Sequence, residues 1–171
     1  SMTGSDIALE HEGEFALLKG QQCFMAPAIR PDVALIHVPW ATADGAVRVR
    51  GDGFDVDLAK SAGCLVVTAE KIVSRAEFGA CEGIIIARRA DVLIDAPYGA
   101  HPTSCFPFYV NDIRHLLDYS EKARHPVDLD AYFEKYVNCS HLNYVTAVGT
   151  ERLRQLEIFA SVASRHVRGT R

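Results

Sequence analysis

One stretch decides the fold expected of this chain: Val33-Ala34-Leu35-Ile36-His37-Val38. It is a short, continuous apolar run rich in β-branched residues, entered through Pro31-Asp32 and followed by Pro39. Strands buried on both faces of a parallel sheet have this composition, whereas half-exposed strands alternate apolar and polar residues. We therefore predict a buried parallel strand over residues 33–38, ended by Pro39.

Further strands are expected at Cys64-Leu65-Val66-Val67-Thr68-Ala69 and Val92-Leu93-Ile94-Asp95, with a shorter one at residues 83–87. Val47-Arg48-Val49 alternates apolar and charged residues, which is typical of a half-exposed strand. Asp55 is a candidate N-cap for a short helix between two of these strands. Strands separated by crossover segments predict an α/β fold with three layers and a mainly parallel sheet.

Helical patterns replace strand patterns after about residue 110. Apolar residues at helical spacing predict a helix over residues 110–124, which Pro126 then breaks. Asp128 and Thr150 are candidate N-caps of two further helices. The apolar stripe expected on the last of them comprises Leu153, Leu156, Ala160 and Ala163.

The length of 171 residues predicts one domain. Residues 1–14 are polar and aperiodic, and Ser1-Met2 reads as a remnant of tag removal, so we expect a flexible N-terminus there. Residues 15–171 are expected to form a single α/β domain whose helical tail begins at about residue 110.

Composition excludes several functional classes. A formal net charge of −4 argues against a nucleic-acid partner, and no apolar run is long enough to suggest a membrane partner. The five cysteines are scattered and never form a C-x-x-C pair, so neither a disulfide framework nor a metal site is expected, and a cytoplasmic location fits best. The sequence has no glycine-rich phosphate loop of the G-x-G-x-x-G or Walker type.

The segment most suggestive of a functional site is Ala96-Pro97-Tyr98-Gly99-Ala100-His101-Pro102-Thr103-Ser104-Cys105, called the strand-end loop below. It follows directly on the strand expected at residues 92–95. Ligands of open α/β sheets bind beyond the carboxyl ends of the strands, so this loop is placed where a site is expected.

Three segments resemble the α subunit of family I coenzyme A transferases, the glutaconate CoA-transferase type. The first runs from Pro27 to Val38 and continues in Ala43-Asp44-Gly45-Ala46-Val47, where Ala46 replaces the family's usual asparagine. The second is Val66-Val67-Thr68-Ala69-Glu70-Lys71-Ile72-Val73. The third and most specific is the strand-end loop, followed by Tyr109 and Asp112, and the order and spacing of all three agree.

The resemblance covers roughly residues 20–120 and implies a CoA-transferase-like fold. The family's glycine-rich N-terminal half has no counterpart, so the chain resembles the C-terminal part of such a subunit. In this family the nucleophilic glutamate belongs to a homologous β-type subunit, where it attacks the thioester, forms an anhydride and then a glutamyl-CoA thioester. No catalytic residue is therefore expected in this chain, which alone should be inactive.

The implied function is transfer of CoA between an acyl-CoA and a small carboxylic acid in a heteromer with a β-type partner. CoA thioester is then a substrate, and no permanently bound cofactor is expected. One alternative is a decarboxylase or hydrolase of a glutaconyl-type CoA ester on the same scaffold. Another is a non-catalytic assembly module.

His101 and Ser104 are the leading candidates for contact with the acyl substrate, through a thioester carbonyl or a carboxylate. Each has a structural alternative, because a loop histidine can fix the turn and a loop hydroxyl can bond its own backbone. The full set of expected substrate-binding residues is Tyr98, Gly99, His101, Ser104 and Tyr109.

Other residues have weaker claims to a chemical role. Cys105 lacks a nearby cation that would ionise its thiol, and Glu82-Gly83 lacks the serine and asparagine of the β-subunit motif. Glu70 is expected in a salt bridge or cap at a subunit seam, and His37 as a hydrogen-bonded core group. Asp112 is expected to cap the helix that follows it or to orient His101.

Overall fold

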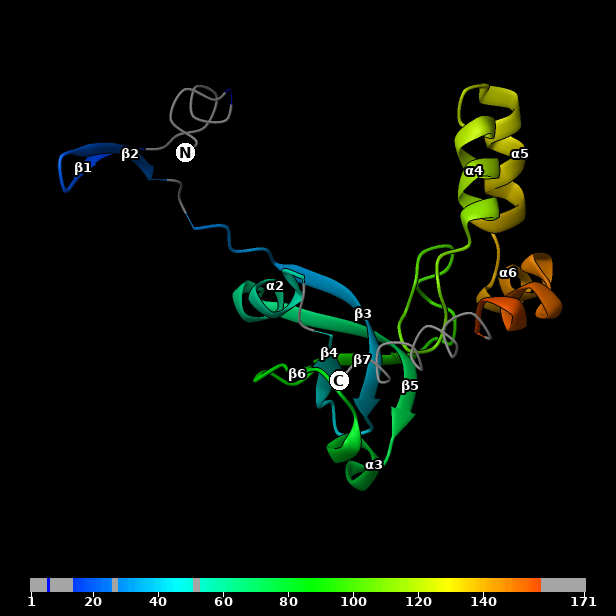
Figure 1. Cartoon of the computed structure of the whole chain (residues 1–171), viewed down its shortest axis with the longest axis horizontal. Coiled ribbons are helices and arrows are strands. Elements are labelled where there is room, and N and C mark those ends of the chain that lie inside the picture. The colour runs from blue at the N-terminus through cyan, green and yellow to red at the C-terminus, as the bar shows by residue number, and fades with distance from the viewer. Residues whose placement is uncertain (1–5, 7–13, 26–27, 51–52, 158–171) are drawn as a thin grey trace, which may run out of the picture.

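The computed structural model describes residues 6, 14–25, 28–50 and 53–157. Its main element is a five-stranded sheet with the strand order β6-β4-β3-β5-β7 (Figure 1). The strands are β3 (Val33–Thr42), β4 (Val47–Val49), β5 (Cys64–Val73), β6 (Ile84–Ile85) and β7 (Val92–Asp95). Strands β3, β5 and β7 are parallel, whereas β4 and β6 are antiparallel to their neighbours, so the expected α/β class is confirmed with a mixed sheet.

Strand β3 continues beyond Pro39, so the prediction that this proline ends the strand is wrong. A proline lacks the N–H that a ladder hydrogen bond requires, and it is tolerated where one side of the strand is not paired. Strand β4 pairs with β3 at Trp40 and Ala41, and Pro39 has no partner in this pairing or in the pairing with β5. The β3–β5 pairing resumes at Trp40 and Lys71.

In the described part of the chain, one face of the sheet is covered and the other is not. Alternating side chains of β3 and β5 pack against α2 (Asp55–Ser61) in an apolar core that includes Ile36, Leu65 and Ala59. On the opposite face, Leu35 lies in register with Val66 and Val92. The large apolar side chains exposed along this face are Val33, Leu35, Val92 and Ile94.

The open face corrects the expectation that residues 33–38 are buried on both sides. Val33 and Leu35 are 57% and 67% exposed, respectively, in the described part of the chain. A continuous apolar run nevertheless indicates a strand that is covered on both faces in its working state. We call the surface formed by Val33, Leu35, Val92 and Ile94 the open sheet face.

Strand β4 is buried throughout, which corrects the prediction of a half-exposed strand. The guanidinium of Arg48 lies 5.0 Å from the ring centre of Phe78 in α3 (Arg75–Ala80). It also donates a hydrogen bond of 2.9 Å to the carbonyl of Gly83. These two contacts hold a charged side chain inside the fold, a placement that alternation alone does not reveal.

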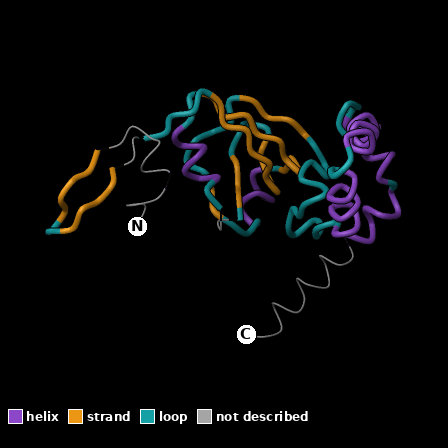
Figure 2. Tube along the Cα trace, turned by 90° about the horizontal axis from the view of Figure 1, so that it is seen from above, coloured by secondary structure: helices purple, strands orange, loops and turns teal. Residues whose placement is uncertain are grey.

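The remaining helices lie at the other end of the molecule (Figure 2). They are α4 (Ile113–Lys122), α5 (Pro126–Tyr136) and α6 (His141–Val148), and residues 150–157 are also helical. A separate antiparallel hairpin is formed by β1 (Glu14–Leu18) and β2 (Gln21–Met25). Among the described helices, none combines the length and the apolar character needed to cross a membrane.

Helix boundaries differ from the expected ones in several places, and α4 spans Ile113–Lys122 rather than residues 110–124. Phe54 rather than Asp55 occupies the N-cap of α2, and His125 rather than Asp128 occupies that of α5, because Pro126 suits the first helical turn. Helix α6, capped by Ser140, was not predicted. Thr150 is the first helical residue after Gly149 rather than a cap. The expected positions Ala160 and Ala163 lie outside the described residues.

Candidate functional site

The strand-end loop begins directly after β7, whose last residue, Asp95, lies beside Ala69 of β5. Strands β3, β5 and β7 are parallel and adjacent, and β3 and β5 continue beyond the end of β7 to Thr42 and Val73, so the loop leaves the sheet alongside them. Ile94 of β7 lies in register with Thr68 of β5, which in turn lies beside His37 of β3. Polar side chains of β3 and β5 therefore meet the loop at the end of the open sheet face.

A buried carboxylate, that of Glu70, connects the sheet to the loop. Its Oε1 accepts the backbone N–H of Tyr98 at 2.7 Å, and its Oε2 accepts the Tyr109 hydroxyl at 3.0 Å. The Nε2 of His37 lies 3.2 Å from Oε2, and the His37 Nδ1 lies 2.9 Å from the Thr68 hydroxyl. We call this set the Glu70 network, and its members are His37, Thr68, Glu70, Tyr98 and Tyr109.

Gly99 lies against the same network with no room for a side chain. A β-carbon placed there would lie 2.6 Å from Cε1 of His37 and 2.8 Å from the carbonyl oxygen of Ala96. That carbonyl accepts the Gly99 N–H at 2.9 Å and is fixed by the turn. Glycine is therefore required here for close approach of the backbone to a side chain.

A second polar network joins the far end of the loop to the helices. The carboxylate of Asp112 accepts Nε of Arg152 at 2.9 Å and Nη2 of Arg152 at 2.5 Å. It also accepts the backbone N–H of His115 at 3.0 Å, which makes Asp112 the N-cap of α4. We call this set the Asp112 network, and its members are His101, Asp112, His115, Tyr144 and Arg152.

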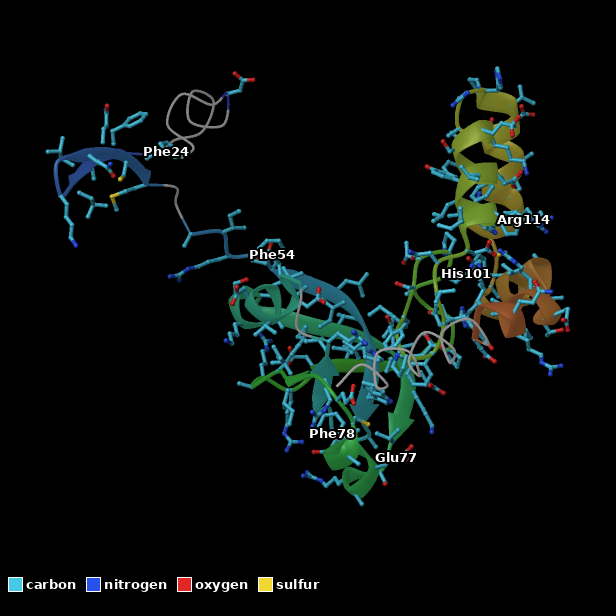
Figure 3. All side chains as sticks on the ribbon, viewed as in Figure 1. Phe24, Phe54, Glu77, Phe78, His101 and Arg114 are labelled. Atoms are coloured by element: carbon cyan, nitrogen blue, oxygen red, sulfur yellow. The ribbon has the colours of Figure 1, made fainter. Side chains whose placement is uncertain are left out.

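His101 is fully enclosed by the Asp112 network, where the loop meets the helices (Figure 3). Its Nε2 lies 3.3 Å from Oδ2 of Asp112, and its Nδ1 lies 2.5 Å from the Tyr144 hydroxyl. The side chain of His101 is 0% exposed, so both ring nitrogens are turned toward protein groups. The imidazole holds the loop against α4 and α6, and direct substrate contact by His101 stays a prediction.

Burial and charge set the protonation of this network. Burial alone would raise the pKa of Asp112, but hydrogen bonds from Arg152, from the His115 N–H and from His101 outweigh it and hold that pKa well below its usual range. Burial lowers the pKa of His101 and of His115, against the opposing effect of the Asp112 charge. Asp112 both caps α4 and faces His101, so the two roles considered for it coexist.

The other sequence-predicted site residues occupy different environments. Tyr109 is fully buried, and its hydroxyl accepts the Ala100 N–H at 3.1 Å. Tyr98 is half-buried and donates its hydroxyl proton to Glu157. Gly99 and Ser104 are exposed, and Ser104 is therefore the predicted side chain most accessible to a ligand.

Cys105 is buried beside Tyr109, Leu153 and Leu156. Burial, reinforced by the negative charge of Glu70, raises the pKa of the Cys105 thiol to about 12. The thiol therefore stays protonated at neutral pH and is not a nucleophile, in line with the structural role favoured for it.

Two clusters contain side chains that metal ions use as ligands, and in each cluster the ligand atoms lie within 4.8 Å of one another. They are His37 with Glu70 and Cys105, and His101 with Asp112 and His115. In the second cluster, Arg152 already donates to both carboxylate oxygens of Asp112. A metal ion bound there would be repelled by the positive charge of this guanidinium. In the first, Glu70 accepts three donors, so both clusters are satisfied as hydrogen-bonded networks.

The importance of Glu70, His37, Tyr144 and Arg152 to this site was not predicted. A signal for the first two was present, because alternation along residues 64–70 places Thr68 and Glu70 on one face. Parallel pairing of two apolar strands then brings His37 beside Thr68. Tyr144 and Arg152 lie 43 and 40 residues from their partners, and no local pattern indicates such contacts.

Comparison with known proteins identifies relatives, although no protein-family model matches the sequence. The A-type subunit of glutaconate CoA-transferase from Acidaminococcus fermentans is 34% identical over 144 residues, which are 81% of this chain and 45% of the relative. The crystal structure of glutaconate CoA-transferase from that organism matches with a TM-score of 0.77 and 30% identity, over 86% of this chain and 49% of that chain. This chain is a homologue of the A-type subunits of CoA-transferases.

A second curated relative supports the same assignment. The A-type subunit of 3-oxoadipate CoA-transferase from Pseudomonas knackmussii is 28% identical over 121 residues, covering 69% of this chain and 42% of the relative. The expected CoA-transferase-like fold is thereby confirmed. The chain spans less than half the length of each of these two relatives.

In this CoA-transferase homologue, the lowered pKa values of His101 and His115 predict a loss of stability in mild acid. Below the ordinary histidine pKa of about 6.5, the unfolded chain binds protons that the folded chain does not, so the free energy of unfolding falls as pH decreases. Urea unfolding at several pH values between about 7.5 and 5 measures this. His115→Gln should reduce the dependence, whereas His125→Gln, at an exposed histidine, should not. A free energy of unfolding that stays constant over this range would contradict the prediction.

Proposed function

We propose that this chain is an α-type subunit that, together with a homologous β-type subunit, transfers CoA between an acyl-CoA and a small carboxylic acid. The observation that carries the proposal is homology to the A-type subunits of CoA-transferases that includes their fold. The strand-end loop, fastened by the Glu70 and Asp112 networks at the carboxyl ends of the strands, forms one wall of the acyl pocket.

The nucleophile belongs to the partner. In the described residues, the carboxylate of Glu70 is occupied by three hydrogen-bond donors, and the thiol of Cys105 is protonated. A nucleophile must be ionised and free to attack the thioester carbonyl and expel the CoA thiolate, and neither group meets both conditions. The CoA thioester is accordingly a substrate that this chain helps to bind.

The open sheet face supports association with another polypeptide layer. This face presents adjacent apolar side chains, those of Val33, Leu35, Val92 and Ile94. The Glu70 network lies at one end of the face. Apolar surface of this kind is normally covered in the working protein. The uncovered apolar surface is continuous with the strand-end loop. This supports a site to which residues outside the described part of this chain also contribute.

Thioester exchange tests the proposed function. The chain alone, the β-type partner alone and the co-expressed pair are each incubated with an acyl-CoA and an isotopically labelled carboxylic acid, and labelled acyl-CoA is measured. The proposal predicts exchange by the pair and none by either component. Release of free CoA or of carbon dioxide in place of exchange would favour the hydrolase or decarboxylase alternative. A pair that assembles without any reaction would favour the assembly module.

Ser104→Ala tests the loop as a pocket wall. Because Ser104 is exposed, its loss should leave the free energy of unfolding within about 0.5 kcal/mol. Removing one hydrogen bond to the acyl substrate should lower kcat/KM for exchange about 10-fold. Ser120→Ala, at an exposed serine in α4, is the matched control and should leave exchange unchanged. Thioester exchange at the full rate in both variants would show that Ser104 does not contact the acyl substrate.

A further inference from the structure

We propose that Glu70 is the positioning residue of the acyl pocket, since its buried carboxylate fixes the backbone of residues 98–100 through two hydrogen-bonded routes. The relevance to catalysis rests on the proposed function, whereas the fixing of the backbone does not. Glu70 lies within β5, one residue beyond Ala69, the partner of the last residue of β7, and its side chain is 5% exposed. It reaches the loop across 28 residues of sequence.

The first route is direct. Oε1 of Glu70 accepts the N–H of Tyr98 at 2.7 Å, within the range of charge-assisted hydrogen bonds. Tyr98 has a φ of 62°, in the left-handed region that a non-glycine residue adopts at a cost. A strong acceptor for its N–H helps to hold Tyr98 in that conformation, and Tyr98 sets the direction of the turn that follows.

The second route passes through Tyr109. The Tyr109 hydroxyl donates to Oε2 of Glu70 at 3.0 Å and accepts the Ala100 N–H at 3.1 Å. The carboxylate fixes the direction of the single hydroxyl proton of Tyr109. The lone pairs of the hydroxyl oxygen are then free to accept the N–H of Ala100. The Tyr109 ring is fully buried, which keeps this relay in place.

One of the three donors to Glu70, the Tyr98 N–H, belongs to the strand-end loop itself. Among the described residues, the ion-pair partner of Glu70 is His37, at 3.2 Å, and the other two donors are the Tyr98 N–H and the Tyr109 hydroxyl. The negative charge of Glu70 also contributes, after burial, to the raised pKa of Tyr109. A buried carboxylate needs its donors, so loop and carboxylate stabilise each other's position. His37 also restricts the position of the loop backbone, because its ring lies against Gly99.

Hydrogen exchange of single amides in the co-expressed complex tests the positioning role. Glu70→Gln removes the charge at nearly constant size and should accelerate exchange of the Tyr98 and Ala100 amides by about 10-fold or more, as the loss of a hydrogen bond to a charged group implies. Glu77→Gln, at an exposed carboxylate paired with Lys71, is the matched control. Hydrogen-exchange rates of the Tyr98 and Ala100 amides in Glu70→Gln that equal those of the wild type would overturn the proposal.

Tyr109→Phe keeps the buried ring and removes only the hydroxyl that connects Glu70 to Ala100. It therefore tests the second route even if Glu70→Gln does not fold. It should accelerate exchange at Ala100 while Tyr98 retains its direct bond to Glu70. Equal acceleration at both amides would indicate general loosening and contradict the two-route arrangement. This signature is independent of any enzymatic activity.

Kinetics then connect the position of the backbone to catalysis. In the complex, Glu70→Gln should raise KM for the acyl-CoA about 10-fold while kcat falls less, because a displaced wall weakens substrate binding. Unchanged kinetics in a variant with accelerated amide exchange would contradict a role in the pocket. A wild-type complex without transferase activity would refute the proposed function and leave the amide-exchange result to decide the positioning role alone.

Discussion

Asp112→Ala is expected to lower the free energy of unfolding by about 2–4 kcal/mol, because it removes the buried carboxylate of a half-buried ion pair and a helix cap. The Asp112 side chain is 2% exposed, and its loss leaves the guanidinium of Arg152 without either of its two hydrogen bonds to the carboxylate. The same change removes the N-cap of α4, because the carboxylate accepts the His115 N–H. Urea unfolding of the full chain measures the effect.

Asp118→Ala is the control for Asp112→Ala. Asp118 forms a half-buried pair with Lys122 on the same helix, and pairs that solvent can reach contribute only about 0–1 kcal/mol. Asp112→Asn should be intermediate, since an amide oxygen can still cap α4 but carries no charge for Arg152. A loss in Asp112→Ala no greater than that in Asp118→Ala would show that the Asp112 network does not fasten the loop to the helices.

Gly99→Ala is expected to reduce kcat/KM for thioester exchange about 100-fold, the effect of a displacement of about 1 Å at reacting groups. The added methyl would meet His37 at 2.6 Å and the Ala96 carbonyl oxygen at 2.8 Å, both closer than van der Waals contact allows. The Ala96 carbonyl accepts the N–H of Gly99 itself, so relieving the clash moves the backbone of the strand-end loop between residues 96 and 99. Overpacking should also lower the free energy of unfolding by about 1–3 kcal/mol.

Gly79→Ala provides a matched control for Gly99→Ala. Gly79 lies in α3, and a β-carbon there meets nothing within 4 Å. Alanine is the better helix former, so the control should keep full exchange activity and unfold no more easily than the wild type. Full exchange activity in Gly99→Ala would show that the loop backbone at Gly99 does not shape the acyl pocket.

The strands and the edge at which they meet were predictable because the sequence marks them locally. Residues 33–38, 64–69 and 92–95 are compact apolar runs, and all three lie within observed strands. The strand-end loop follows the last of them, so its place beyond the carboxyl ends of the strands follows from parallel pairing.

Features that depend on distant contacts could not be predicted in the same way. Burial of Arg48 depends on the ring of Phe78 and the carbonyl of Gly83, about 30 residues away. Continuation of β3 through Pro39 depends on how little of β3 is paired with β4. The enclosure of His101 depends on Tyr144, in a helix that carries no strong sequence signal.

The strand-end loop could therefore be singled out from the sequence, whereas the hydrogen-bond partners of its residues come from the structure. His101 was expected at the substrate, and the structure encloses it between Asp112 and Tyr144. Glu70 and His37 were expected in structural roles, and they prove to be the contacts that hold the loop at the sheet edge. Ser104 keeps the accessible position that a substrate contact requires.

The central claim is that this chain supplies part of a pocket whose nucleophile lies in a β-type partner. The most direct measurement incubates the co-expressed complex with acyl-CoA labelled in the CoA moiety, without acceptor acid, and locates the label by mass spectrometry of both chains. The account predicts CoA joined as a thioester to a carboxylate of the partner and none on this chain. CoA attached to this chain, at Glu70 or Cys105 for example, would contradict it.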